Sequence, residues 1–198
     1  IAATAPLALY TGTFEAYQGV DLLTDAAALI AAERPDARVL VVGGEPAQVA
    51  AAKAKAADRG AAVVMIFTGQ QPANEIPGFV QAADLLVSPR IRGTNTPLKI
   101  YSYLRSGKPI VATNLLTHTQ VLNSEIAKLG GPAAEPLAQA VLELIEQPEQ
   151  CARLAAAARI VAQEKYSRES YVRRTAQAYE RLGAGKSVGL RSEGLARP

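Results

Sequence analysis

The stretch DLLVSPRIRGTNTPLKIYSYLRSGKPIVAT, residues 84–113, indicates how the chain folds. It opens with an apolar run, passes through a loop with two arginines, and continues with a helical pattern from Pro97 to Ser106 that Gly107 ends. A second apolar run, Pro109 to Thr113, follows at once. Two apolar runs joined by a helix are typical of parallel β-strands with a crossover helix. The stretch therefore predicts one unit of a parallel sheet, with a basic loop at the carboxyl end of its first strand.

The same alternation precedes this stretch along the chain. Further strands are predicted at 7–14, 37–44 and 61–69, and further helices at 20–32, 46–59, 74–83 and 117–122. Strands that are apolar throughout and joined by helices predict a doubly wound parallel sheet covered on both faces, which is a Rossmann-like α/β domain. In such sheets ligands bind at the carboxyl ends of the strands, so the loops there are the candidate site.

The alternation stops after Gly130, Gly131 and Pro132. Three consecutive helices are predicted beyond this turn, at 136–146, 152–165 and 168–182. We therefore expect one domain over residues 1–182, with 133–182 as a helical C-terminal extension. The glycine-rich tail, residues 183–198, lacks periodicity and is expected to be disordered. Because residue 1 is Ile, we expect the chain to begin inside a longer polypeptide.

Composition excludes several classes of protein. The 198 residues are 49% hydrophobic and 20% charged with a net charge of +3, which is too mildly basic for a nucleic-acid-binding surface, so no nucleic-acid partner is expected. No run approaches the roughly 20 apolar residues of a membrane span and no signal peptide is visible, so the cytoplasm is the expected location. The single cysteine, Cys151, excludes a disulfide framework within the chain and is expected to pack as a small hydrophobe.

The start of the predicted helix at Pro97 favours anion binding. Thr96 is expected to be the N-cap and Pro97 the first helical residue, which leaves the backbone amides of Leu98 and Lys99 without partners inside the helix. These amides and the positive end of the helix dipole would face the ligand. Lys99 and Ser102 are three residues apart and share a helix face.

Arg90 and Arg92 add cations to the loop before this helix. A guanidinium group can donate two parallel hydrogen bonds to the oxygens of one phosphate. The alternative is a solvated basic loop. Anion binding is favoured because the charges coincide with a strand end and a helix start. Gly12, at the end of the first strand, permits close approach of a phosphate, although a strand-end glycine taken alone more often serves turn geometry.

Other catalytic signatures are weak or absent. His118 is the only histidine and cannot form a metal site alone, so an acid–base role and a structural role both stay open. The sequence contains no dinucleotide-binding glycine fingerprint, nucleophile elbow or Walker A motif.

Five segments in order resemble the C-terminal domain of retaining glycosyltransferases of family 4 (glycosyl transferases group 1), which have the two-domain GT-B fold. They are YTGTFEAYQGVDLL, PDARVLVVGG, VVMIFTGQ, EIPGFVQAADLLVSP and TPLKIYSYLRSGKPIVAT. The resemblance covers residues 7–182, and LKIYSYLRSGKPIVAT together with AADLLVSP is its most specific part. It implies that this domain binds a nucleoside-diphosphate sugar. It also implies that, in the complete enzyme, the sugar is transferred with retention, in a cleft shared with an N-terminal domain, usually without a bound metal.

The chain departs from the family pattern in its polar residues. The family's first loop usually carries an arginine and a lysine where this chain has Thr13 and Gln18. Two glutamates of the family's helix motif correspond to Thr94 and Ser102. In the family the first faces the donor sugar, a role that Thr94 puts in doubt, and the second holds ribose hydroxyls, which Ser102 could do only with its single hydroxyl. We hypothesise a divergent subfamily whose phosphate pocket is built from different residues.

In that hypothesis Arg90, Arg92 and Lys99 replace the missing cations. The donor and phosphate set implied by the resemblance and the loop is Gly12, Thr13, Arg90, Arg92, Thr96, Leu98, Lys99 and Ser102, with Phe67, Gly69 and Gln70 near the base. No metal ligand and no cofactor other than the donor are expected. The resemblance also implies hexosyl transfer in polysaccharide biosynthesis, peripheral association with the inner face of the membrane, and a fragment that binds a nucleotide but transfers nothing.

Three other functions are compatible with a domain of this kind to different degrees. A sugar-nucleotide epimerase of the same fold needs more carboxylates and histidines than the single His118. A flavodoxin-like receiver needs clustered acidic residues that the chain lacks. A non-catalytic binding domain derived from a transferase stays open, because both family glutamates are replaced. The nucleotide, the sugar and the acceptor also stay open.

Overall fold

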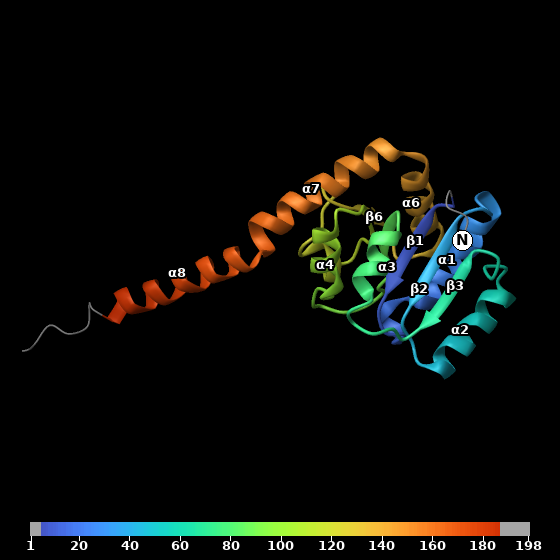
Figure 1. Cartoon of the computed structure of the whole chain (residues 1–198), viewed down its shortest axis with the longest axis horizontal. Helices are drawn as coiled ribbons and strands as arrows, with labels where there is room; N and C mark the ends of the chain where they lie inside the picture. The colour runs from blue at the N-terminus through green and yellow to red at the C-terminus, as the bar shows by residue number, and fades with distance from the viewer. Residues whose placement is uncertain (1–4, 187–198) are drawn as a thin grey trace, which may run out of the picture.

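A parallel β-sheet forms the centre of the domain (Figure 1). The computed structural model describes residues 5–186, with side chains described up to residue 182. Within them the sheet has six strands in the order β3-β2-β1-β4-β5-β6, all paired in parallel. The strands are β1 (Leu7–Thr11), β2 (Arg38–Val42), β3 (Met65–Gly69), β4 (Leu85–Ser88), β5 (Ile110–Thr113) and β6 (Lys128–Gly130). The predicted doubly wound, Rossmann-like α/β fold is confirmed.

Helices cover both faces of the sheet (Figure 1). One face carries α1 (Val20–Glu33), α2 (Pro46–Asp58) and α6 (Ala134–Glu146). The other carries α3 (Ile76–Ala82), α4 (Lys99–Ser106) and α7 (Pro148–Tyr166). The remaining helices are η1 (Ala16–Gln18), α5 (Leu116–Thr119) and α8 (Arg168–Lys186).

Strand β1 shows why the strands are apolar throughout. Successive side chains of a strand point to opposite faces. Leu9 therefore packs with the cluster under α4 and α7, and Tyr10 with the cluster under α1 and α6. Both side chains are fully buried. Leu9 is also in register with Leu40 of β2 and Leu86 of β4, so this strand lies at the centre of the sheet.

Some boundaries differ from the prediction. Strand β3 begins at Met65, because residues 61–64 continue the turn that ends α2, with the Ala61 amide bonded to the Ala56 carbonyl at 2.8 Å. Strand β6 was not predicted at all. It has only three residues, Lys128 and Leu129 are half-buried, and it pairs with β5 alone, so it lacks the apolar run that marks the inner strands.

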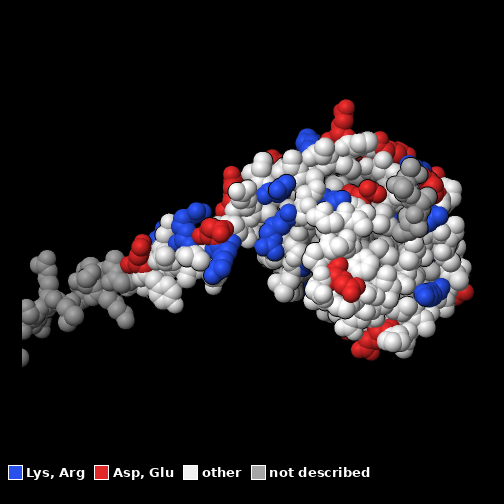
Figure 2. Space-filling view, viewed as in Figure 1, with Lys and Arg blue, Asp and Glu red and all other residues white. Residues whose placement is uncertain are grey.

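The C-terminal helix α8 leaves the body of the domain (Figure 1). It continues to Lys186, so the disorder predicted for residues 183–198 is wrong for 183–186, which extend the helix. Residues 187–198 lie outside the described part of the chain. Lysine and arginine side chains gather along α8 and beside its junction with the domain (Figure 2), and Tyr171, Val172 and Tyr179 are exposed on it. Within residues 5–186 no helix is long and apolar enough to cross a membrane.

Candidate functional site

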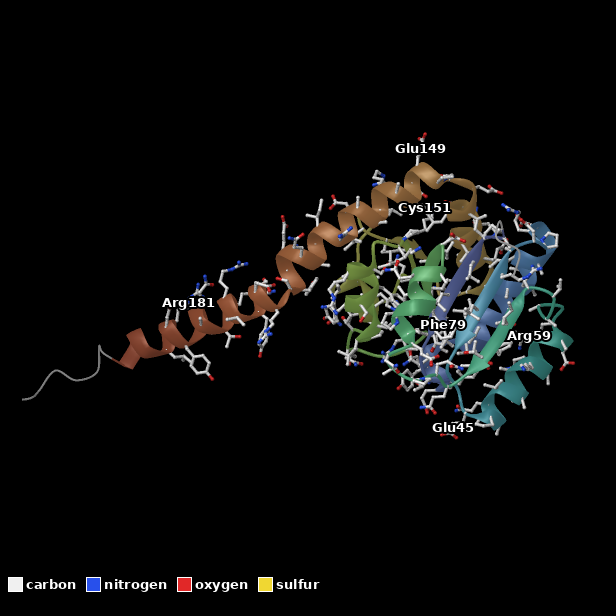
Figure 3. All side chains as sticks on the ribbon, viewed as in Figure 1. Glu45, Arg59, Phe79, Glu149, Cys151 and Arg181 are labelled. Atoms are coloured by element: carbon white, nitrogen blue, oxygen red, sulfur yellow. The ribbon has the colours of Figure 1, made fainter. Side chains whose placement is uncertain are left out.

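The sheet order creates a crevice between β1 and β4. From β1 the chain winds outward to β3, then returns to β4 on the other side of β1, so the loops after these two strands diverge. A pocket of about 670 Å³ opens there. Figure 3 places Glu45, one of its lining residues, at this end of the sheet, far from Glu149 and Cys151 on α7. The lining also includes Thr11, Gly12, Thr13, Glu15, Tyr17, Gln18, Val42, Gly43, Gly44, Gln48, Gln70, Gln71, Ile76, Arg90, Asn95, Pro97, Leu98 and Lys99.

Two glycines let the loop after β1 pass close to the pocket floor. Gly12 has a φ of +152°, and a Cβ there would lie 2.8 Å from the Tyr10 hydroxyl and 2.9 Å from the Lys99 ammonium nitrogen. A Cβ on Gly43, where φ is +130°, would overlap the carbonyl oxygen of Gly12. Side chains at either position would therefore push the loop away from Lys99.

Lys99 is a buried cation without a hydrogen-bond acceptor. Within the described residues its Nζ is buried and has no hydrogen-bond partner. The nitrogen lies 3.9 Å from the centroid of the Tyr10 ring, and the Tyr10 hydroxyl donates to the Thr13 carbonyl at 2.7 Å, which holds the ring in place. Burial, with a smaller contribution from Arg90, lowers the pKa of Lys99 to about 7. An ammonium in this state gains strongly from an anion placed in the pocket.

Arg90 is the second cation of the pocket and is already held by its own loop. Its Nε donates to the Arg92 carbonyl at 2.7 Å and its Nη2 donates to Asn95 Oδ1 at 3.0 Å. The guanidinium carbon lies 4.9 Å from the centroid of the Tyr17 ring. A guanidinium has five N–H donors, so Arg90 keeps donors for a ligand. The side chain of Arg92 is exposed and lies outside the pocket lining.

The start of α4 differs from the prediction. The residue before the first helical residue is Leu98, with helical backbone angles of φ −58° and ψ −29°, and no side chain caps the helix. The first turn is closed by bonds from Ile100 to Pro97 at 3.0 Å and from Tyr101 to Leu98 at 3.2 Å. Thr96 is thus not the N-cap, because Pro97 and Leu98 already wind as a tight turn. The amides of Leu98 and Lys99 still come before that of Ile100, which makes the first hydrogen bond of the turn.

The residues at the positions of the family glutamates do not line the pocket. Thr94 and Ser102 are both exposed. It is Tyr103 that turns from α4 toward the end of β1, where the Thr11 amide donates to its hydroxyl at 3.1 Å. The helix face that meets the sheet carries Ile100, Tyr103 and Leu104, and Ser102 lies on the exposed part of α4.

Of the residues predicted near the base, only Gln70 lines the pocket. Gly69 lies at the end of β3 outside the lining, and Phe67 packs edge-on against Phe14 with ring centroids 6.4 Å apart. Sequence reasoning missed the polar residues Glu15, Tyr17, Gln48 and Gln71. The sequence did contain one signal for Gln48. Glu45 and Gln48 form a capping box at the start of α2, and this helix start lies at the rim of the pocket.

His118 and Cys151 lie outside the pocket lining. His118 is fully buried, with Nε2 2.8 Å from the Ser88 hydroxyl, and burial lowers its pKa to about 4, which favours the structural role. Cys151 is half-buried, its thiol donates to the Leu144 carbonyl at 3.0 Å, and burial raises its pKa, as expected for a packed hydrophobe. Among residues 5–186 no three His, Cys, Asp or Glu side chains form a group that could hold a metal ion.

Comparison with protein families assigns most of the chain. The sequence profile of the family described as Glycosyl transferases group 1 matches residues 1–161. No curated protein matches the chain significantly.

Solved structures share the fold. Sucrose-phosphate synthase from Thermosynechococcus elongatus superposes with a TM-score of 0.80 at 23% identity, over 93% of this chain and 47% of that one. The Anabaena protein HepE in complex with UDP gives a TM-score of 0.78 at 20% identity, over 91% and 49%. The C-terminal domain of a glycosyl transferase group 1 family protein (LpcC) from Francisella tularensis gives 0.72 at 19% identity, over 83% and 87%. The chain thus spans about half the length of the first two proteins.

Proposed function

Because this chain belongs to the glycosyl transferases group 1 family, we propose that it is the donor-binding domain of a glycosyltransferase and that its pocket holds a nucleoside-diphosphate sugar. One observation carries the proposal: the ammonium of Lys99 is buried beside the pocket at the switch point of the sheet, and no residue of the described part of the chain accepts a hydrogen bond from it. A diphosphate would supply that acceptor. In sugar transfer the diphosphate is the leaving group, and cations placed beside it stabilise the charge that develops on it.

The pocket offers replacements for the two basic residues of the family's first loop. Thr13 and Gln18, which stand at those positions, both line the pocket but carry no charge. Two cations line the same pocket from the other side: Arg90 comes from the loop after β4, and Lys99 from the start of α4. We infer that these two residues bind the diphosphate in this chain. This proposal gives no main binding role to Arg92, Thr96 or Ser102, which lie outside the pocket lining.

Uridine nucleotides are the first donors to test. Structures of the Anabaena protein HepE have been solved with UDP, with UDP and glucose, and with UDP-glucose. Guanosine and adenosine sugar nucleotides remain candidates for this chain, because its pocket lining is rich in glutamine amides that can both donate and accept.

The complete enzyme is proposed to belong to family 4 and to transfer a hexose with retention. The acceptor site and the opposite wall of the cleft would come from an N-terminal domain. The chain spans 47% and 49% of the first two solved proteins, which fits such a division. The 198-residue chain alone would therefore bind the donor without transferring it. Metal-free donor binding, a cytoplasmic location, and polysaccharide synthesis at the inner membrane face belong to the same proposal.

A second candidate function is a non-catalytic binding domain derived from a transferase. It is favoured by one observation: Thr94 and Ser102 replace the two family glutamates, and both are exposed and outside the pocket lining. Donor binding would persist in such a protein while transfer would not. Assays of donor hydrolysis and sugar transfer on the chain joined to its N-terminal domain separate the two functions.

The test of the proposal is a thermal-shift panel on the 198-residue chain. Uridine, guanosine and adenosine diphosphates and their glucose and mannose conjugates are titrated separately. A ligand present at 100 times its dissociation constant stabilises the folded state by about 2.7 kcal/mol, so the melting temperature should rise with concentration for one nucleotide series. If none of the nucleotides raises the melting temperature, and calorimetry also detects no binding, the proposal is wrong.

A further inference from the structure

We propose that the short helix α5 clamps the loop of residues 90–95 in its binding position, with Thr117 and His118 as positioning residues for the anion site. We call residues 90–95 the Arg90 loop. The inference rests on the proposed function, because it concerns how that pocket is held in shape. Neither Thr117 nor His118 lines the pocket, so any effect on a ligand must pass through this loop.

Side chains of residues 113–120 donate hydrogen bonds to backbone carbonyls of the Arg90 loop. The Thr117 hydroxyl donates to the Asn95 carbonyl at 2.7 Å. The side-chain amide of Gln120 donates to the Thr94 carbonyl. At the other end of the loop, the Thr113 hydroxyl donates to the Arg90 carbonyl at 2.5 Å. The loop is therefore fixed at its first residue and at its last two residues.

His118 completes the contact at Arg90. Its Nδ1 lies 2.9 Å from the Thr113 carbonyl, which can only accept, so Nδ1 carries the proton. Nε2 then accepts the hydroxyl proton of Ser88 at 2.8 Å. Nδ1 is also 3.0 Å from the Thr113 hydroxyl oxygen, which has given its own proton to the Arg90 carbonyl. His118 thus orients the Thr113 hydroxyl toward the loop and ties together the last residues of β4 and β5.

The clamp holds the carbonyls of Arg90 and Asn95. These are the two residues of the Arg90 loop that line the pocket. Their side chains are joined by the bond from Arg90 Nη2 to Asn95 Oδ1 at 3.0 Å. From the opposite side, the Ile91 amide donates to the Tyr17 carbonyl at 2.9 Å. Releasing the α5 side would let the Arg90 loop shift together with the guanidinium that its residues hold, while Lys99 keeps its place on α4. The clamp therefore determines where the second cation of the site lies.

The test compares three variants of the 198-residue chain: Thr117→Val, Thr117→Ser and Thr119→Val. Valine has the shape of threonine without the hydroxyl, serine keeps the hydroxyl, and Thr119 is an exposed residue of the same helix. The first readout, hydrogen exchange of the ligand-free chain, follows the Ile91 amide. Thr117→Val is expected to speed its exchange several-fold, whereas the other two variants exchange like wild type. Equal exchange in all four proteins overturns the clamp.

The second readout is binding of UDP-glucose and of uridine, which lacks phosphate. Thr117→Val is expected to weaken UDP-glucose binding by about two- to tenfold, the range for one hydrogen bond, and to leave uridine binding unchanged. Equal weakening of both ligands, or of neither, overturns the positioning role. In an Arg90→Met background the same change should have no further effect.

The two proposals fail in different ways. If wild type binds no sugar nucleotide, the proposed function fails and the exchange readout still decides the clamp. If wild type binds UDP-glucose and Thr117→Val matches it in both readouts, the proposed function stands and the clamp is refuted.

Discussion

Replacing Lys99 by methionine should weaken donor binding and stabilise the empty protein at the same time. Methionine keeps the buried stem of the side chain and removes its charge. In the ligand-free chain the ammonium of Lys99 is buried and has no acceptor among residues 5–182, and its pKa is lowered to about 7 by burial and by Arg90. The groups that face it are Tyr10 below the nitrogen and Arg90 across the pocket, and neither is an anion.

The magnitude follows from the fraction of Lys99 that is charged. With a pKa of about 7, Lys99 is about 90% protonated at about pH 6 and about 3% protonated at about pH 8.5. If only the charged form holds the diphosphate, wild-type binding of UDP-glucose weakens by at most about 30-fold over that interval. Lys99→Met should bind about 10- to 100-fold more weakly than wild type at about pH 6 and should show no such pH dependence.

The assay is isothermal titration calorimetry with UDP-glucose. This ligand lacks a phosphate monoester, whose second ionisation near pH 6 would add its own pH dependence. Titrations near pH 7 in buffers of different ionisation enthalpy should show uptake of about half a proton by wild type and none by Lys99→Met. Lys53→Met, on the exposed side of α2, is the matched control and should behave as wild type. Equal affinity of wild type and Lys99→Met at low pH would refute the reasoning.

Stability should change in the opposite direction to affinity. The unfolded chain binds a proton at Lys99 up to about pH 10.5 and the folded chain only up to about pH 7, so stability of wild type rises with pH between these values. The cost of the buried charge is fully present below about pH 7. Lys99→Met should therefore be more stable than wild type at low pH, by a few kcal/mol at most, and lose this advantage as pH rises. Urea unfolding at several pH values measures the effect.

Three further predictions concern the rest of the pocket. Gly12→Ala should destabilise the chain by about 1–3 kcal/mol in urea unfolding, because its Cβ would crowd the Tyr10 hydroxyl at a φ of +152°. Gly78→Ala, in helix α3 with nothing within 4 Å of the added Cβ, is the control and should be as stable as wild type or slightly more stable; equal stability of the two variants would contradict the packing. Arg90→Ala should weaken UDP-glucose binding in calorimetry about tenfold or more and Arg92→Ala less than about twofold, because only the first lines the pocket. Excess EDTA should leave UDP-glucose binding unchanged, and a loss of binding would show that a metal takes part.

Sequence reasoning succeeded where a property depends on near neighbours along the chain. The inner strands and their crossover helices were predicted because each contains its own apolar pattern. It failed at β6, whose three residues are ordered by pairing with β5 and carry little apolar signal. It also failed at Thr96, because Pro97 and Leu98 wind as a tight turn and the residue before the helix is Leu98. Spacing along α4 does not say which way the helix is turned against the sheet, so it did not show that Ser102 lies outside the pocket lining.

The amino-acid sequence by itself determined the parallel α/β architecture, the edge of the sheet where the loops meet, and the presence of cations in the loop after β4. Only the tertiary structure decided that the ammonium nitrogen of Lys99 lies buried between Gly12 and the ring of Tyr10 while Arg92 is exposed. The physical reason is that burial and charge separation depend on contacts between segments that are far apart in the chain. Such contacts set the dielectric environment of a side chain, and local residue patterns do not record them.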